Sequence, residues 1–149
     1  MSLYGRYAAG IGDYVCNPEC LHLAVVITDQ YGGVTLIDGQ PSPFRLVSRQ
    51  MSEFQTDSVF SVELSVPEGM SARAFASALR ANANAYTPVL YSVPYLPSGF
   101  LPANEYNSNS FASGLLRSVS GSVPSVSFGK YQAPGWNNPV PRQNFGGAN

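Results

Sequence analysis

The sequence predicts an α+β fold in which a small antiparallel sheet packs on two helices. Two observations predict the sheet: a β-branched apolar run is followed by a glycine turn and a second apolar run, and a later segment alternates apolar with polar residues. A third predicts the helices, because two segments carry apolar residues at helical spacing. The expected elements are strands at 21–28, 34–38 and 59–66, a helix at 71–86, and a helix from 108 or 109 to 118.

The first two strands form a hairpin that begins with the only histidine, His22. Residues 21–28 are short, β-branched and bounded by turn residues, which is typical of a buried strand. The dipeptide Asp-Gly favours turns, so we expect residues 38–41 to close the second strand. Residues 44–47 add a short third piece.

The first helix is predicted over residues 71–86. It is rich in alanine, and Phe75, Leu79 and Ala83 share one face, so this stripe is expected to be core and not a cofactor site. Pro88 follows the segment and stops it. The second helix opens with a polar turn and continues into apolar residues at helical spacing.

The chain has 149 residues, near the usual size of one domain, so we predict a single domain over 1–149. Its core spans 20–118, and a tail rich in Ser, Pro, Gly and Asn, 119–149, packs on the body. Within the tail, residues 123–128 are a candidate edge strand, and residues 132–149 are expected to be extended coil. Its lone tryptophan, Trp136, is expected to anchor the tail.

Charge and hydropathy exclude several classes of partner. Only 11% of residues are charged, the net charge is −1, and the basic residues are scattered, so we expect no nucleic-acid partner. No apolar run approaches the roughly 18 to 20 residues that span a bilayer, so we expect no transmembrane segment. Residues 1–15 lack the apolar core of a signal peptide. The low charge is common in exported bacterial proteins.

Two cysteines, Cys16 and Cys20, are separated by three residues. They can close a small disulfide loop, remain free thiols, or supply two metal ligands. Zinc needs two more ligands, and only His22 is nearby, so we expect no metal and an ordinary buried or bonded pair.

The second helix begins in a turn, residues 107–111, that carries two serines, Ser108 and Ser110. A serine at a helix N-terminus meets backbone N–H groups and the positive end of the helix dipole, which favour a developing negative charge. A serine hydroxyl needs a neighbouring base, and His22 is the only imidazole available. Ser110 competes with Ser108 as nucleophile and is also a candidate N-cap.

Four other polar residues are candidates to support this chemistry. Asp38 follows the strand that pairs with the His22 strand, so its carboxylate can orient the imidazole, although a simple turn role stays open. Gln40 is a second candidate for the same role. Asn107 and Asn109 are expected either to cap the helix or to donate into an oxyanion site.

Three stretches of the chain together resemble circularly permuted papain-like proteins of the NlpC/P60 superfamily: His-Leu-Ala-Val-Val-Ile from His22, Val-Thr-Leu-Ile-Asp after the glycine turn, and Tyr-Asn-Ser-Asn-Ser-Phe ending at Phe111. In that group, which includes lecithin:retinol acyltransferase-like and PPPDE-type isopeptidase branches, the histidine precedes the nucleophile. The nucleophile is typically a cysteine in an Asn-Cys-Asn-x-Phe turn that opens a helix. The resemblance places Ser108 on the cysteine position and Asp38 on the polar third position.

The resemblance implies a permuted papain-like hydrolase or acyltransferase that acts on an amide, isopeptide or ester bond. The backbone N–H groups around Ser108 and Asn109 would stabilise the oxyanion, and no cofactor is implied. Peptides, peptidoglycan and lipid acyl groups are the expected substrates. Serine at the cysteine position is compatible with a natural variant, a degenerate site, or a cysteine replaced to silence a toxic enzyme, because a hydroxyl is much harder to ionise than a thiol.

The ending over residues 131–141 is similar to tails of C-terminal toxin domains in Rhs-type and other secreted bacterial effectors. This second resemblance implies an antibacterial effector, delivered by a dedicated machine such as a type VI secretion system, with a cognate immunity protein as a partner. The alternative is a non-catalytic binding or structural module of the same fold. In that case the Tyr- and Pro-rich segment 86–106 would contact a peptide, glycan or lipid.

Overall fold

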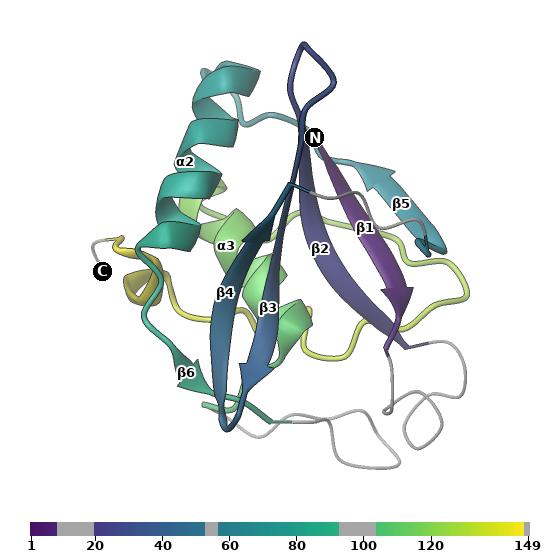
Figure 1. Ribbon diagram of the computed structural model, residues 1–149, viewed down its shortest axis with the longest axis vertical. Coiled ribbons are helices and arrows are strands. Elements are labelled where there is room, and N and C mark those ends of the chain that lie inside the picture. Colours follow the sequence, from purple (N-terminus) through teal and green to yellow (C-terminus); the bar gives the residue numbers. More distant parts are fainter. Residues whose placement is uncertain (9–19, 53–56, 93–103, 148–149) are drawn as a thin grey trace.

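The computed structural model describes residues 1–8, 20–52, 57–92 and 104–147 and shows an α+β arrangement (Figure 1). Among these residues, six strands form one antiparallel sheet in the order β5-β1-β2-β3-β4-β6. The strands are β1 (Ser2–Tyr7), β2 (Leu21–Thr28), β3 (Val34–Ser42), β4 (Arg45–Met51), β5 (Phe60–Glu63) and β6 (Val89–Leu90). The helices are α2 (Ala72–Asn84), α3 (Ser108–Ser120) and the 3-10 helix η1 (Arg142–Phe145). The predicted α+β class with an antiparallel sheet on two helices is confirmed.

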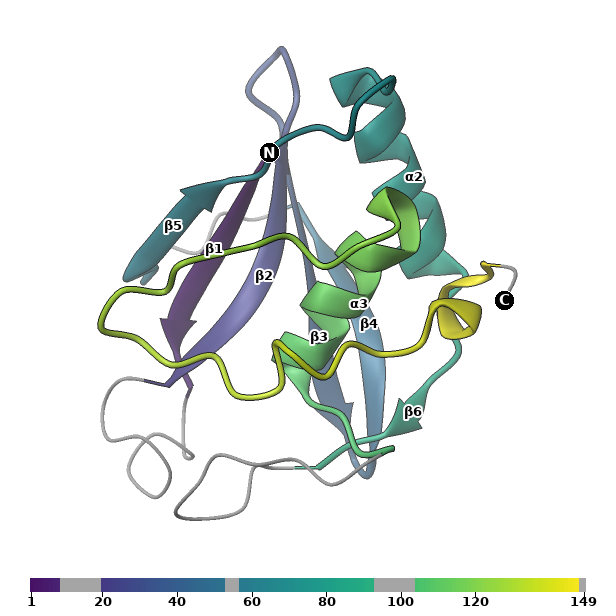
Figure 2. The same ribbon diagram turned by 180° about the vertical axis from the view of Figure 1, so that it is seen from behind.

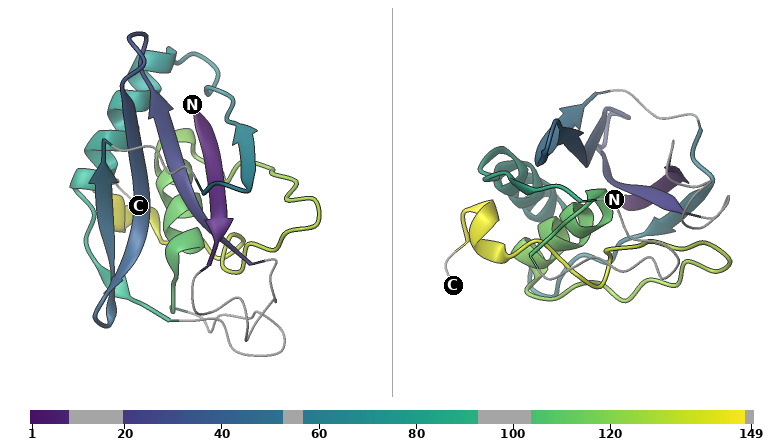
Figure 3. Two further views of the ribbon diagram at one scale, coloured as in Figure 1. Left: turned by 45° about the vertical axis from the view of Figure 1, so that its right-hand side comes forward. Right: turned by 90° about the horizontal axis from the view of Figure 1, so that it is seen from below.

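Both helices and the C-terminal segment lie on one face of the sheet, which we call the helix face (Figures 2 and 3). Side chains alternate along β2, and its odd-numbered residues from Leu21 to Ile27 are buried in the main core with Phe111 and Leu115 of α3. The even-numbered Ala24 and Val26 belong to a separate small cluster on the opposite, outer face. Alternation along β2 therefore separates the core from the face where His22 lies.

Strand β1 was not expected from the sequence. It pairs with β2 on one side and with β5 on the other. A glycine at its centre, Gly5, weakens its strand propensity, but a Cβ there would lie 3.1 Å from Leu21 Cδ1, so the small residue allows tight packing. Pairing on both sides stabilises a segment whose own composition does not predict a strand.

The turn predicted over residues 38–41 is wrong, because these residues lie inside β3 and pair with β4. The hairpin turn comes later, at residues 43–44. Gly39 serves a close approach instead of a turn, since an added Cβ would lie 2.6 Å from Phe111 Cβ of α3. β4 is correspondingly longer than the short piece expected at 44–47.

The two predicted helices are present with small shifts at their ends. Ser71 caps α2, its Oγ accepting from the N–H of Ala74 at 3.1 Å, and the buried side of the helix contains Phe75, Leu79 and Ala83 as predicted. α3 continues to Ser120, two residues beyond the predicted end.

The C-terminal part differs most from the expectation. Residues 123–128 form no strand, and β5 is half as long as the predicted 59–66. The segment after residue 132 is not extended coil: Trp136 is buried against Phe128, with ring centroids 5.4 Å apart, and η1 brings Phe145 into the main core. Burial of these aromatic rings folds a segment whose composition alone predicts coil. Among the described helices, none is long and apolar enough to cross a membrane.

Candidate functional site

His22 lies near the start of β2, on the outer face of the sheet. Its neighbours Leu21 and Leu23 point into the core, so strand alternation directs the imidazole the other way. The side chain is 12% exposed, and its Nε2 lies 3.0 Å from Oδ2 of Asp38. The predicted pairing of His22 with Asp38 is therefore present.

Asp38 is completely buried and accepts hydrogen bonds at both oxygens. Arg49 on β4 donates from Nη2 to Oδ2 at 2.7 Å and from Nε to Oδ1 at 3.0 Å. This two-point contact between guanidinium and carboxylate is the strongest geometry available to such a pair. It fixes the carboxylate that faces His22.

The surroundings of Asp38 keep its carboxyl ionised. Burial raises the pKa, but the hydrogen bonds from His22 and Arg49 and the positive charges of these groups outweigh burial and lower the pKa to about 2. The hydrogen bond to Asp38 in turn raises the pKa of the Arg49 guanidinium. An ionised Asp38 can accept an N–H from His22 Nε2, and in the neutral tautomer that carries this proton the lone pair is on Nδ1.

Gln40 also contacts this pair, as the sequence suggested. Its Nε2 donates to Asp38 Oδ2 at 2.6 Å and lies 3.1 Å from His22 Nε2. When His22 donates to Asp38, two donors face each other across the longer distance, so Gln40 acts on the carboxylate and not on the imidazole. We call His22, Asp38, Gln40 and Arg49 the outer cluster.

Sequence reasoning missed Arg49. The signal that identifies it is the strand register, in which Arg49 lies directly opposite Asp38. Placing Asp38 in a turn concealed this relation, because a turn residue has no cross-strand partner of this kind.

The start of α3 is capped by Asn107. Its Oδ1 accepts from the backbone N–H groups of Asn109 at 2.9 Å and Ser110 at 3.0 Å. Ser110 is therefore not the N-cap. Because Asn109 N–H already donates to the cap, the N–H of Ser108 is the remaining candidate oxyanion donor, and it has no partner among the described residues.

The two serines of the turn differ in what their hydroxyls do. Ser110 is completely buried, and its Oγ donates to the carbonyl of Gly135 at 3.1 Å. Ser108 is 9% exposed, and its hydroxyl makes no hydrogen bond within the described part of the chain. Of the two candidates, only Ser108 has a hydroxyl that is uncommitted.

Asn109 joins α3 to the segment that carries His22. Its Oδ1 accepts from Leu23 N–H at 2.9 Å, and its Nδ2 donates to Leu21 O at 2.8 Å. These are the two neighbours of His22. β1 pairs with the start of β2 on one edge, but on the other edge β3 pairs with β2 only from Ala24 onward. On that second edge, the Asn109 amide supplies the hydrogen bonds that a paired strand would make. The side chain therefore has a structural role and does not point freely into a site.

The C-terminal segment completes this contact. The carbonyl of Pro134 accepts from Asn107 Nδ2 at 2.8 Å and from Asn109 Nδ2 at 3.0 Å. Gly135 follows with a φ of +89°, and an added Cβ would lie 2.7 Å from Ser110 Oγ, so a side chain is excluded there. We call Asn107, Asn109, Ser110 and residues 134–135 the amide clamp. Sequence analysis left Pro134 and Gly135 outside the core.

The structure brings the predicted residues together in two groups. His22, Asp38 and Gln40 meet in the outer cluster, and Asn107 and Asn109 meet beside Ser108 in the amide clamp. Although His22 and Ser108 are both described, no hydrogen bond joins them. The link between the groups is the hydrogen bonding of Asn109 on either side of His22.

The Tyr- and Pro-rich segment 86–106 is not an open recognition surface at its two ends. Tyr86 and Tyr106 are 9% and 8% exposed and belong to the main core, and burial raises the pKa of both hydroxyls. The expectation is wrong for these two residues, and residues 93–103 lie outside the described part.

Cys20 is in a disulfide, and Cys16 lies outside the described residues. Within the part of the chain that the structure describes, no group of three or more His, Cys, Asp or Glu side chains is placed to hold a metal ion.

No protein-family model, curated protein or solved structure matches this chain.

Proposed function

We propose that the protein is a hydrolase or acyltransferase of amide, isopeptide or ester bonds, with Ser108 as nucleophile, His22 as general base and Asp38 as the residue that orients the imidazole. The observation that carries the proposal is the 3.0 Å contact from His22 Nε2 to Asp38 Oδ2. A buried, ionised carboxylate that holds one ring nitrogen prepares the other for proton transfer.

In the proposed reaction, His22 Nδ1 accepts the proton of the Ser108 hydroxyl while Oγ attacks the carbonyl carbon. The tetrahedral oxyanion accepts the Ser108 N–H at the positive end of α3. The imidazolium then gives its proton to the leaving amine or alcohol, which leaves an acyl-enzyme. Water, or an acceptor hydroxyl or amine, then gives its proton to His22 as it attacks the acyl carbon. The bond from that carbon to Ser108 Oγ breaks, and Oγ takes the proton back from the imidazolium, which restores both side chains. His22 lies on the outer face of the sheet and α3 on the helix face, so the proposed reaction requires the two side chains to meet past the start of β2 once substrate is bound.

A fluorophosphonate probe tests the nucleophile, because an activated serine displaces fluoride and gains the phosphonyl mass. We expect one label on the wild type, none on Ser108→Ala, and at least a 100-fold slower reaction for His22→Ala, since general-base assistance contributes about 100-fold or more. The exposed Ser122→Ala is the control and labels normally. Equal labelling of wild type and His22→Ala would contradict the dyad.

Substrate class is tested by mass spectrometry of peptidoglycan fragments and lipids after incubation with wild type, Ser108→Cys and His22→Ala. The first two proteins are expected to release acyl or peptide products, and the third is expected to release none. Products from Ser108→Cys alone would identify Ser108 as the replacement of a functional cysteine.

We further propose an antibacterial effector role, in which a secretion system delivers the protein and an immunity protein neutralises it. Toxicity on expression in the compartment that holds the substrate, relieved by His22→Ala, is the expected result. Equal toxicity of the two forms would contradict this role.

The absence of a His22–Ser108 hydrogen bond favours one second candidate, a non-catalytic binding module. That function predicts no fluorophosphonate label on any form and peptide or glycan binding that is unchanged in Ser108→Ala.

A further inference from the structure

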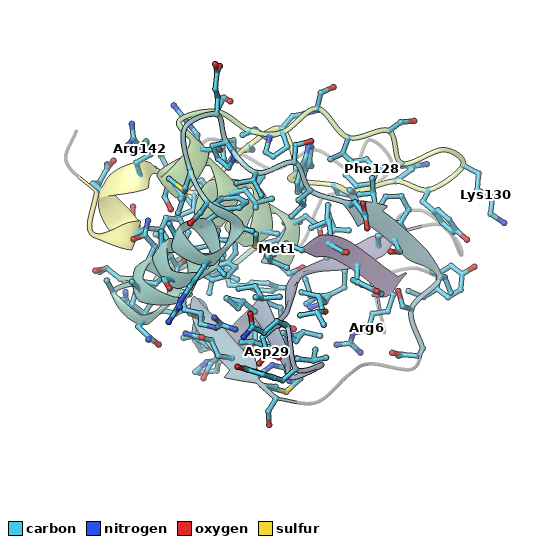
Figure 4. All side chains as sticks on the ribbon, turned by 90° about the horizontal axis from the view of Figure 1, so that it is seen from above. Met1, Arg6, Asp29, Phe128, Lys130 and Arg142 are labelled. Carbon is cyan, nitrogen blue, oxygen red and sulfur yellow. The ribbon has the colours of Figure 1, made fainter. Side chains whose placement is uncertain are left out.

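Arg6 lies beside His22 on the outer face of the sheet and has no role in the reaction proposed above. The register of β1 with β2 puts Arg6 directly opposite His22. Side chains opposite each other in an antiparallel pair have Cβ atoms about 4.5 to 5.5 Å apart. Figure 4 shows Arg6 and Phe128 on opposite sides of β1, with Phe128 on the helix face.

The guanidinium of Arg6 has no charged partner among the described residues. Its Nε is buried and has no hydrogen-bond partner, and within the described residues it makes no ion pair. Arg49, the other arginine beside the His22–Asp38 pair, has its Nε and one Nη engaged by Asp38. A buried N–H without a partner is unfavourable in the free protein, and a ligand oxygen would satisfy it.

Among the described residues, the charged side chains that contact His22 or lie directly opposite it are Arg6, Asp38 and, through Asp38, Arg49. Arg49 is paired with Asp38, so the Arg6 guanidinium is the group beside His22 without a negative partner among the described residues. A carboxylate carries one negative charge and matches the planar fork of a guanidinium, as the Asp38–Arg49 contact on the same face illustrates.

We infer that Arg6 binds a carboxylate of the substrate next to His22, so that the bond attacked belongs to a molecule with a free carboxylate, such as an N-acylated amino acid or a peptide C-terminus. This inference rests on the proposed function for the identity of the reacting bond. Arg6 is a specificity-determining residue in this scheme, and it does not take part in proton transfer.

Binding is tested without turnover by following the arginine Nε–H signals in ¹H–¹⁵N spectra while N-acetylalanine is added. We expect the Arg6 Nε–H signal to shift with N-acetylalanine and not with the neutral N-acetylalaninamide. Arg6→Gln is expected to weaken N-acetylalanine binding roughly 10-fold to 100-fold, the range for charge-assisted hydrogen bonds. Arg6→Lys keeps the charge but lacks the planar fork, so its affinity for N-acetylalanine is expected to lie between those of the wild type and Arg6→Gln. Arg73→Gln, on the exposed side of α2, is the control and is expected to bind N-acetylalanine normally.

Three results would overturn the inference: no shift of the Arg6 signal, equal binding of the acid and its amide, or tighter binding of methyl phosphate than of N-acetylalanine. These outcomes do not depend on Ser108. If fluorophosphonate labelling fails while N-acetylalanine binds through Arg6, the proposed reaction fails and the carboxylate site stands. If labelling succeeds and Arg6→Gln binds N-acetylalanine normally, the carboxylate site alone fails.

Discussion

The outer cluster and the amide clamp both lie at the start of β2, and they differ in kind. The outer cluster contains charged groups around a completely buried carboxylate, Asp38. The amide clamp contains only neutral amides, hydroxyls and backbone groups, and its Asn109 has partners for both ends of its side-chain amide.

This difference separates a structural role from a chemical one. Neutral groups that hydrogen-bond to one another cost little free energy to bury, so the amide clamp stabilises the packing of α3 and the C-terminal segment on β2. Burying a charge costs much more, and an ion pair seldom recovers that cost in stability. The charged outer cluster is therefore compatible with the proposed role of His22, whereas the neutral amide clamp is explained by stability.

The largest expected effect comes from breaking the amide clamp at Asn109. Asn109→Ala leaves the Leu23 N–H and the Leu21 carbonyl without their side-chain partner, and each costs about 1 to 3 kcal/mol, whereas the Pro134 carbonyl keeps its hydrogen bond from Asn107. We expect the free energy of unfolding in urea to fall by about 4 kcal/mol. The exposed Asn137→Ala is the control and should change it by less than about 0.5 kcal/mol. A loss of less than about 1 kcal/mol in the unfolding free energy of Asn109→Ala would show that the amide clamp does not stabilise the fold.

A smaller, pH-dependent effect is expected at Asp38 in the outer cluster. Its pKa is lowered from 3.8 to about 2 in the folded protein, so on acidification the unfolded state takes up the proton first. The resulting stability, about 2 kcal/mol, is present above about pH 4 and is lost as the pH falls from about 4 to 2. Asp38→Asn should be less stable than wild type at pH 7, and the gap should narrow over this range.

Urea unfolding at pH 7, 4, 3 and 2 measures this change, and Asp57→Asn, at an exposed position, is the control. Parallel pH curves for wild type and Asp38→Asn would show that the Asp38 carboxylate contributes nothing to folding in its ionised form.

The smallest effect is expected at Gln40. Gln40→Ala removes one hydrogen bond to Asp38 Oδ2, while the contacts from His22 and Arg49 remain. Because Gln40 is partly exposed, we expect a loss of about 1 kcal/mol in unfolding free energy at pH 7, with the acid dependence of wild type retained. The exposed Gln143→Ala serves as control. A loss as large as that of Asp38→Asn would mean that Gln40, and not Arg49, holds the carboxylate.

Local patterns predicted the elements whose signals lie within a few residues. The alanine-rich stripe of α2 and the hairpin of β2 and β3 are examples, because helix periodicity and short turns act between near neighbours. Strand β1 and the C-terminal part of β3, residues 39–42, were not predicted from the sequence. Both contain a glycine that lowers strand propensity, and both are stabilised by partners supplied by other parts of the chain.

The sequence by itself therefore determined the α+β class and the two helices, and it named Asp38 as one candidate partner of His22. Only the tertiary structure decided that Arg49 holds Asp38, that Asn109 reaches the backbone of Leu21, 88 positions away, and that Pro134 accepts from α3. Contacts of this kind depend on how strands register and where a helix packs. No local pattern encodes them, because both partners become neighbours only after the chain has folded.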